Sequence, residues 1–489
     1  MLEDYEKEDL HDEQQKNTIR DLISTQDEFV RNDLRVLTVN HLKNFQKKLS
    51  CSSHEQMEVI SNLRVFVLKS EVKPSILPEN FIFDFVNVFS SSSTTTYVKT
   101  ALLSLSDDMM KYDINFVKEF EKYKYYMHIL NEMINQTCCR IEYCLPVLNH
   151  FLRHSKIATS YLFGRNLPGF ILDQITTEKN SLRTSITLYN SLQAISTFTY
   201  QTLNPESMAR IVDICLDKII PNKNKKSFID LETSIIVPIV KTLANMMKFI
   251  PDGEYLDKIV NSGVSSFILT IVTNENFELS VAALNLLCDA TFRSNVICAQ
   301  LKNVGAVQEL SRLLLFPEFF KVCSKQCLRT IYNILVAFHG NNVAVSYSFE
   351  CMKDENFKKV IKYVLAEGKS FEKDTIYIIL GIIIYFSEPE NVLKYIQEFD
   401  ILDNLQSMID TGNNEGAHGA LAIAYRLADL AFSSIYNSQI LNDFSEIMHS
   451  DEMIDSLNNF MSCSSDEDVC NYARYLLSWI YKDKKPNSV

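Results

Sequence analysis

The stretch from Leu256 to Ala290 reads LDKIVNSGVSSFILTIVTNENFELSVAALNLLCDA, and the stretch from Val296 to Leu335 reads VICAQLKNVGAVQELSRLLLFPEFFKVCSKQCLRTIYNIL. Each predicts a short helix that ends at a glycine, a second helix with apolar residues at helical spacing, and a longer third helix with a nearly all-apolar strip. The two glycines, Gly263 and Gly305, lie 42 residues apart. A period of this length is typical of HEAT and armadillo repeats.

The same three-helix layout continues in both directions along the chain. Steps between second helices are most often 41 to 44 residues, and second helices are predicted to begin near Phe81, Tyr123, Leu167, Met208, Val264, Ala306, Lys358, Ile401 and Met453. A longer step contains the polar run Pro221-Asn-Lys-Asn-Lys-Lys226, which we expect to form a loop. We therefore predict an all-α fold, a right-handed alpha-alpha superhelix of the armadillo or HEAT type.

Length and composition support a repeat architecture. The chain has 489 residues with 11 Gly and 11 Pro, too few for the turns of several sheets. It also exceeds the ~250–300 residues at which one compact core stops growing. We predict an acidic disordered tail at 1–18, a helical N-terminal extension at 19–56, the repeat solenoid at 57–482 and a short tail at 483–489. The segment from Met57 to Ser70 would be the last helix of an incomplete repeat that caps the stack.

Several features bear on the compartment. The longest apolar run, Ile376 to Phe386, is far shorter than the ~20 residues of a membrane span, so we predict no membrane span and read the run as a helix buried on all sides. The start, MLEDYEKEDLHDEQQ, resembles neither a secretory signal nor a transit peptide. The 12 cysteines are scattered, many at apolar helical positions. This use of thiols predicts a cytoplasmic and/or nuclear protein.

Charge and motifs exclude several classes of function. The formal net charge of -13 disfavours direct binding of nucleic acid. No phosphate-cradling glycine loop and no G-x-S-x-G or H-E-x-x-H motif occurs. His150 and His154, with Cys144 earlier on the same helix, have a spacing that can hold zinc, but two histidines without further ligands more often decorate a helix. We expect a protein that is not an enzyme and needs no metal and no cofactor.

Two groups of residues resemble a known family. The family's second helices open with Gly-x-Ile-Pro-x-Leu-Val, and this chain has Asn166-Leu-Pro-Gly-Phe-Ile171 and Gly305-Ala-Val307. Glu71-Val-Lys-Pro-Ser-Ile-Leu-Pro-Glu-Asn80 places a proline as the first repeat of importin-alpha does. By layout more than by identity, residues 57–482 resemble the armadillo superfamily, and most of all a divergent importin-alpha.

The resemblance implies a binding site on the third helices. In that family an Asn on each third helix bonds the main chain of an extended peptide, and the matching positions here are Asn149 in VLNHFL, Asn245 in LANMM and Asn333 in IYNIL. One turn earlier, where the family has Trp, this chain has Leu145, Lys241 and Arg329. Each Asn has a second interpretation, a hydrogen bond within the stack.

Two functions of different kinds follow. The first is a non-enzymatic adaptor that holds an extended, basic peptide segment of a partner protein in its concave groove, as importin-alpha holds cargo in nucleocytoplasmic transport. The second is a catenin- or HEAT-like scaffold that assembles a larger complex through its convex face or its ends. An exposed apolar patch on an end helix would favour the scaffold. The sequence assigns no oligomeric state.

Removing residues 1–18 is expected to leave the fold intact. The segment is acidic and has too little apolar surface to offset the entropy cost of ordering it. Thermal unfolding of the shortened chain, followed by circular dichroism, should match that of the full chain. A midpoint lower by more than a few degrees would show that the segment packs on the repeats.

Overall fold

The computed structural model describes residues 73–483 except for 136–139, 178–179, 198–202, 221–232, 251, 274, 339–341, 412–413, 434–437 and 465, together with 43, 46–47, 56–57, 60–64 and 67. The chain divides into unit 1, Met1–Ser207, and unit 2, Met208–Val489. The predicted tail at 1–18, most of 19–56, the loop at Pro221 to Lys226 and all but Asp483 of the predicted tail at 483–489 lie outside the described residues. One continuous stack over 57–482 stays a prediction.

Unit 1 consists of short helices in a repeating order. Its described elements after residue 72 are η1 (Pro74–Ile76), α3 (Phe81–Ser90), α4 (Thr96–Tyr112), α5 (Asn115–Lys122), α6 (Tyr125–Ile134), α7 (Ile141–His154), α8 (Lys156–Gly164), α9 (Leu167–Thr176) and α10 (Leu182–Ser196). The third helices α4, α7 and α10 pack in succession, and two shorter helices separate each from the next. Described parts of the helix predicted from Met57 to Ser70 bury Ile60, Leu63 and Val67.

Unit 2 continues with the same plan. The boundary with unit 1 falls in α12 (Pro205–Ile219). The elements after it are α13 (Thr233–Phe249), α14 (Glu254–Asn261), α15 (Val264–Thr270), α16 (Phe277–Arg293), α17 (Asn295–Asn303), α18 (Ala306–Leu314), α19 (Pro317–Val336), α20 (Asn342–Cys351), α21 (Glu355–Glu367), α22 (Ser370–Tyr385), α23 (Pro389–Glu398), α24 (Ile401–Thr411), α25 (Asn414–Phe432), α26 (Gln439–Met448), α27 (Asp451–Cys463) and α28 (Glu467–Asp483).

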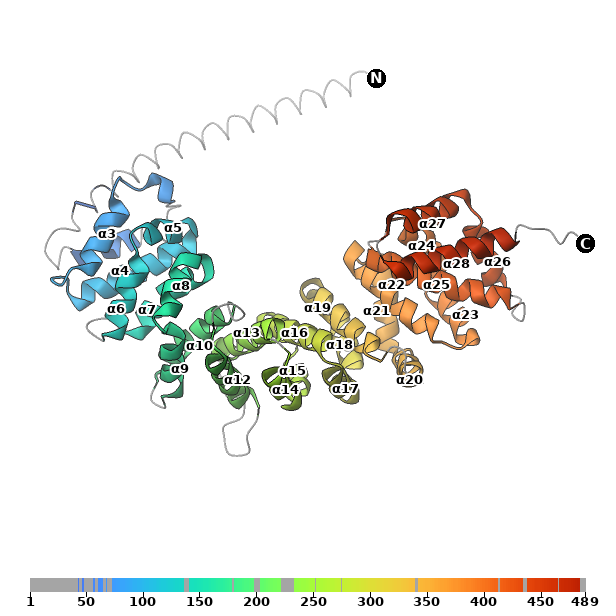
Figure 1. Ribbon diagram of the computed structural model, residues 1–489, viewed down its shortest axis with the longest axis horizontal. Coiled ribbons are helices and arrows are strands. Elements are labelled where there is room, and N and C mark those ends of the chain that lie inside the picture. Colours follow the sequence, from blue (N-terminus) through green and yellow to red (C-terminus); the bar gives the residue numbers. More distant parts are fainter. Residues whose placement is uncertain are drawn as a thin grey trace, which may run out of the picture. The chain divides into compact units, whose positions relative to one another are not determined.

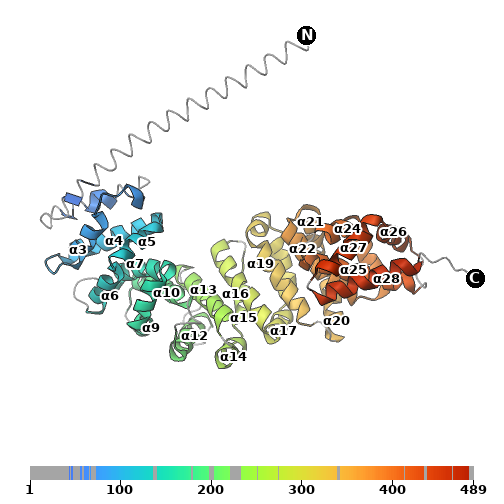
Figure 2. The ribbon, with the colours of Figure 1, turned by 45° about the horizontal axis from the view of Figure 1, so that its top comes forward.

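The described residues therefore form helices only, as predicted, and each unit is an α-solenoid of the armadillo type. In unit 2 the third helices α13, α16, α19, α22, α25 and α28 pack one after another. Figures 1 and 2 show α13 and α16 side by side, with α14 and α15 in a separate row. Five second helices begin at the predicted residue, namely Phe81, Leu167, Val264, Ala306 and Ile401.

A residue in the left-handed conformation stands directly before many second helices. Gly263 and Gly305 have φ of 73° and 72°, which confirms the role predicted for these glycines. The same place is taken by residues with side chains, whose φ lies between 50° and 62°: Asn80, Lys124, Asn166 and Asp400. Asn and Asp tolerate this region better than other residues with a Cβ atom, whereas Lys does not. The turn is therefore a requirement of the repeat that this chain meets with several residue types.

Short polar residues cap the helices that start elsewhere. The hydroxyls of Ser155 and Ser294 accept hydrogen bonds from the main-chain N–H groups of Ala158 and Ile297, and the side chain of Asn276 accepts one from Leu279. Each such bond satisfies one of the N–H groups that a helix start leaves without a partner. These residues therefore fix where the first and third helices begin.

Two glycines allow α22 and α25 to approach closely. A Cβ atom on Gly419 would lie 2.4 Å from the main-chain carbonyl of Tyr377, and one on Gly381 would lie 2.9 Å from the main-chain oxygen of Gly419. Main-chain atoms cannot move away as side chains do, so both positions require glycine.

The prediction that the run from Ile376 to Phe386 is buried on all sides is wrong for one strip. Ile376, Ile379 and Ile383 are buried, but Ile378 and Ile382 are only partly buried and Tyr385 is 38% exposed. The apolar pattern reports that α22 lies between two other third helices. It does not report that one side of such a helix remains open.

Changing Gly263 to Ala is expected to destabilise unit 2 by about 1–2 kcal/mol, the cost of a left-handed conformation for a residue with a Cβ atom. No atom lies within 4 Å of the added methyl group, so the cost would come from the backbone alone. Gly164→Ala is the control, because its Cβ also meets nothing within 4 Å and its φ is not positive. Urea unfolding should show a loss for Gly263→Ala and no loss for the control; equal midpoints would contradict the argument.

Candidate functional site

The third helices of unit 1 enclose a polar pocket. It has a volume of about 490 Å³ and is formed by α4, α7 and α10, with Arg64 at its edge. We call it the unit 1 pocket. It is lined by Arg64, Leu103, Ser104, Asp107, Asp108, Lys111, Glu142, Tyr143, Pro146, Asn149, His150, Arg153, Arg183, Thr187 and Asn190.

Contacts across the pocket define how α7 and α10 are aligned. The hydroxyl of Thr184 donates a hydrogen bond of 3.0 Å to Glu142, and the guanidinium of Arg183 lies 4.8 Å from the ring centre of Tyr143. These four residues stand in the first turn of each helix. The two helices therefore start side by side, and residues at equal distances from their starts face the same part of the pocket.

Asn149, predicted to bind a peptide, lines this pocket from α7. It is 6% exposed, and its side-chain oxygen has no hydrogen-bond partner among the described residues. A buried oxygen without a partner costs about 1–3 kcal/mol. An N–H group delivered into the pocket by a ligand would remove that cost.

Asn190 on α10 has the matching position and was missed by the sequence analysis. It is the ninth residue of its helix, as Asn149 is of α7, and it lines the same pocket. Its side chain is half-buried and forms no hydrogen bond with another described residue. The signal was present in the sequence, because LYNSL at 188–192 repeats the pattern of VLNHF at 147–151.

The other two predicted asparagines lie in unit 2 and differ from this pair. Asn333 on α19 is buried, and its amide donates hydrogen bonds to the main-chain oxygen of Cys288 at 3.2 Å and to the hydroxyl of Thr291 at 3.1 Å. Both acceptors belong to α16, so this amide joins neighbouring third helices. Asn245 lies half-buried on α13 and already takes part in an interaction.

The carboxylates of the unit 1 pocket all have partners. Asp107 lies 3.0 Å from the ring nitrogen Nε2 of His150 and 2.5 Å from Lys111. Asp108 pairs with Arg64 at 2.5 Å. Glu142 accepts the bond from Thr184 and lies 3.8 Å from Arg140. Their negative charge is therefore largely compensated by neighbours.

The pKa of Asp107 shows the strength of this pairing. Burial alone acts to raise its pKa, but the hydrogen bonds from His150 and Lys111 outweigh burial and hold the pKa below its usual value. Because the folded-state pKa is depressed, the stabilisation is present near neutral pH and is lost as the pH falls through that pKa. Asp107 is thus an anion bound to its two neighbours near neutral pH.

Two arginines of the pocket have no carboxylate partner among the described residues. Arg183 touches the ring of Tyr143, and Arg153 forms no ion pair with a described residue. Partial desolvation lowers the pKa of Arg153, and no described carboxylate acts to raise it. Burial, followed by the charges of His150 and Arg153, lowers the pKa of His154 next to it. The local field at this end of the pocket is therefore positive.

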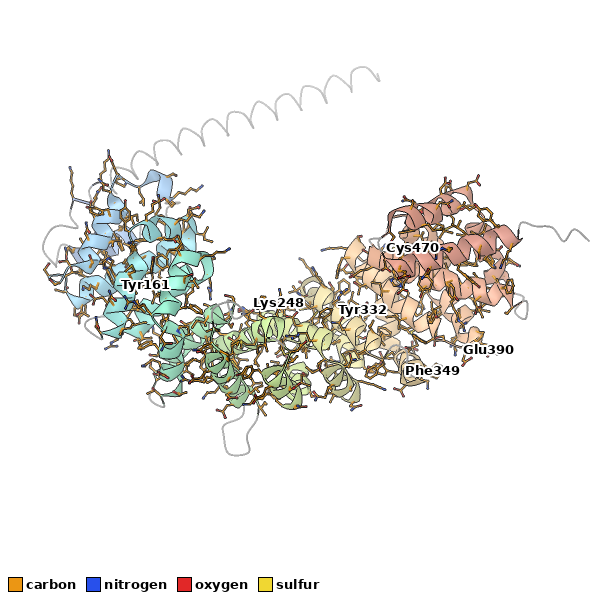
Figure 3. The ribbon with its side chains drawn as sticks, in the orientation of Figure 1. Tyr161, Lys248, Tyr332, Phe349, Glu390 and Cys470 are labelled. Atoms are coloured by element: carbon orange, nitrogen blue, oxygen red, sulfur yellow. The ribbon has the colours of Figure 1, made fainter. Side chains whose placement is uncertain are left out.

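The third helices of unit 2 enclose a second pocket of a different character. It has a volume of about 350 Å³, and we call it the unit 2 pocket. Its walls are mostly apolar, with Tyr332 (labelled in Figure 3) at one side. It is lined by Tyr332, Val336, Ile378, Gly381, Ile382, Tyr385, Glu415, His418, Gly419, Ala422 and Tyr472. The strip of α22 that the sequence analysis placed in the core forms one wall of it.

At the three positions that the sequence analysis matched to Trp of importin-alpha, the side chains of this chain are buried or form ion pairs within the solenoid. Leu145 is fully buried. Lys241 pairs with Glu278 at 2.9 Å, and Arg329 pairs with Glu415 at 2.8 Å. These side chains connect third helices and provide no flat aromatic walls for a lysine stem.

The described part of the chain gives no support for a metal site, a reactive thiol or a membrane span. No group of three or more His, Cys, Asp or Glu residues there is arranged to hold a metal ion. The eight cysteines whose side chains the structure describes are free thiols, and burial raises the pKa of Cys288 to about 11 and that of Cys298 to about 12. None of the described helices combines the length and apolarity of a membrane span. The pair Cys138 and Cys139 lies outside the described residues.

Comparisons with known proteins give a fold and no family. Neither a protein-family model nor a curated protein sequence matches the chain. A solved engineered protein matches 90% of this chain and 99% of its own with a TM-score of 0.62 and 14% identity. A structure from work on a phosphorylation switch that controls the interaction between cadherin and beta-catenin matches 92% and 96%, with a TM-score of 0.57 and 10% identity. A designed armadillo repeat protein matches 56% of this chain at a TM-score of 0.40.

At identities this low, the similarity concerns the fold alone. The two matches with the higher TM-scores each span at least 90% of this chain. They agree with the three-helix repeats described above. The fold is that of an armadillo-type solenoid.

Asn333→Ala is expected to destabilise unit 2 by about 1–3 kcal/mol, because it leaves two acceptors on α16 without their donor. Asn285→Ala is the control, since Asn285 is exposed on α16 and its side chain forms no hydrogen bond with a described residue. Its substitution should change stability by less than about 0.5 kcal/mol. Urea unfolding of both variants compares them directly. If Asn333→Ala unfolds at the same midpoint as the control, the amide does not join the helices.

Proposed function

We propose that this chain is a non-catalytic adaptor that holds an extended segment of a partner protein against its third helices. The observation that carries the proposal is the buried side-chain oxygen of Asn149, which has no partner among the described residues and lines the unit 1 pocket. Asn190 occupies the matching position on the next third helix, and its amide forms no hydrogen bond with another described residue. An amide offers both a donor and an acceptor, so two of them in register can hold an extended main chain whatever its side chains.

The unit 2 pocket supports the same kind of function. Its open strip of Ile378, Ile382 and Tyr385 gives the third helices of that unit an apolar surface. Pockets that bind ligands usually combine such apolar walls with a few polar groups. An apolar side chain of a bound segment would have a place here.

The narrower proposal, cargo recognition in nucleocytoplasmic transport, rests on the resemblance to importin-alpha. It places the chain in the cytoplasm or the nucleus, in keeping with the free thiols. It also requires a groove that favours basic segments. The carboxylates of the unit 1 pocket are paired, and two of its arginines have no carboxylate partner within the described part of the chain, so its charges do not favour a basic segment.

The alternative, a scaffold that assembles through an end helix, requires an apolar patch there. The last described helix, α28, exposes mainly polar side chains on its outer face: Glu467, Asp468, Asn471, Arg474, Ser478 and Lys482. Tyr481 is the large apolar side chain among them, at 54% exposure. A polar outer face is what the terminal helix of a repeat stack needs for solubility, so this end offers little to stack on.

The double variant Asn149→Ala/Asn190→Ala is expected to lose partner binding without unfolding. Peptides that bind the full chain would first be selected from a phage library of random 12-residue peptides. The affinity of each selected peptide for the unchanged chain and for the double variant would then be measured by fluorescence anisotropy. Two lost hydrogen bonds of about 0.5–1.5 kcal/mol each correspond to an affinity roughly 5- to 150-fold lower. The urea midpoint should not fall, because neither amide bonds to another described residue and the variant removes the buried oxygen of Asn149 that has no partner among them.

Asn87→Ala/Asn131→Ala is the matched control. Both residues are exposed on other helices of unit 1, α3 and α6, and neither lines the pocket. This control should bind the peptides as the unchanged chain does. Equal affinity of the Asn149/Asn190 variant for every enriched peptide would show that these amides do not hold the segment.

A further inference from the structure

We infer that the unit 1 pocket selects a segment that carries two adjacent acidic residues, one carboxylate toward Arg183 and the other toward Arg153. The inference rests on the proposed function, and it names the chemistry of the partner. The segment inferred here is acidic, whereas the resemblance to importin-alpha implies a basic one. The argument comes from the charges of the pocket and from the positions of the two arginines along α7 and α10.

Four cationic side chains and three carboxylates line the unit 1 pocket. The carboxylates are bonded to Lys111, His150, Arg64 and Thr184. Arg153 and Arg183 are both exposed, and neither has a carboxylate partner among the described residues. The charge that remains available to a ligand is therefore positive, and a guanidinium binds a carboxylate through two parallel hydrogen bonds.

The two arginines stand on opposite sides of the asparagines. Arg183 lies over Tyr143 at the start of α7, and Arg153 stands ten residues further along that helix. At ~1.5 Å per residue the two ends are roughly 15 Å apart along the helix axis. Asn149 lies between them on α7, and Asn190 lies at the matching place on α10.

An extended segment that crosses the third helices would fit this arrangement. Its main chain would lie on the two asparagines, and its successive side chains would point to opposite sides. One side faces Arg183 and the other faces Arg153. Two adjacent acidic residues satisfy both arginines, whereas acidic residues two apart point to the same side and satisfy one.

The overall charge of the chain does not prevent this binding. The net charge of -13 repels an acidic segment at long range. At physiological salt, charges more than ~8 Å apart are largely screened, so the arginines that touch the segment decide the preference. The affinity for an acidic segment should accordingly fall as salt is raised.

The test uses three fluorescein-labelled peptides and the full chain. The first is Ser-Gly-Ser-Gly-Ser-Glu-Glu-Ser-Gly-Ser-Gly-Ser, and the others have Gln-Gln or Lys-Lys in place of the central pair. Fluorescence anisotropy at physiological salt should show the Glu-Glu peptide binding at least ten-fold more tightly than the Gln-Gln peptide. Arg153→Glu/Arg183→Glu should reverse the order, so that the Lys-Lys peptide binds most tightly.

A control variant separates local from overall charge. Lys156→Glu/Arg165→Glu makes the same change in net charge at two exposed residues of unit 1 that do not line the pocket. It should keep the preference for Glu-Glu within about two-fold. Arg153→Gln/Arg183→Gln, which removes the charges without adding new ones, should abolish the preference. Circular dichroism would verify that each variant is folded.

Other outcomes overturn the inference. If the Lys-Lys peptide binds the unchanged chain most tightly, or the control variant acts like the arginine variant, the arginines do not select the segment. If Asn149→Ala/Asn190→Ala weakens all three peptides while the arginine variants leave their order unchanged, the proposed function stands and this inference falls. If the Glu-Glu peptide binds only after residues 1–18 are removed, the occupant of the pocket is the chain's own acidic segment and not a partner.

Discussion

The structure depends on the packing of each third helix between the third helices that precede and follow it. Such a helix must be apolar on two opposite sides, so its sequence looks almost entirely apolar, as in the run from Ile376 to Phe386. In each unit neighbouring third helices contact one another along the stack, and the stability of a repeat stack is approximately a sum of such interfaces and of the repeats themselves. Side chains of α4, α7 and α10 line the unit 1 pocket, and side chains of α19, α22, α25 and α28 line the unit 2 pocket.

The repeat itself could be predicted because particular residue types mark where its helices end and begin. Gly263 and Gly305 mark left-handed turns, and the second helices after them begin where the sequence placed them. Three more second helices begin at the predicted residue after Asn80, Asn166 and Asp400, whose residue types tolerate the same conformation. The turn at Lys124 carried no such mark, because lysine is not typical of a left-handed conformation, and the second helix predicted near Tyr123 begins at Tyr125. There the tertiary structure imposes the turn against the local preference, and the period of the repeat was the available guide.

The binding site was harder to predict because one residue type serves two purposes. Asn149 and Asn333 stand in nearly identical patterns, VLNHFL and IYNIL. One has a side-chain oxygen without a partner, while the amide of the other bonds to α16. The difference arises because the preceding third helix provides acceptors at Cys288 and Thr291 near Asn333. A sequence pattern describes one helix at a time, so it cannot contain this information. The unit 2 pocket escaped prediction for the same reason, since only its neighbours reveal which side of α22 is open.

The charge that the unit 1 pocket offers to a ligand could not be derived from the sequence either. The resemblance to importin-alpha implied a groove for basic segments, and the formal charge of -13 is compatible with one. In the unit 1 pocket, however, the acidic side chains are bonded to neighbours and the arginines have no carboxylate partner among the described residues. A ligand responds to charges within about one Debye length, and among these it gains most from groups that are not already paired. The pairing pattern, and not the sum of charges, therefore determines which segment the pocket prefers. Pairing is a property of side chains about 40 residues apart in the sequence, as for Asp107 and His150, and only the fold brings them together.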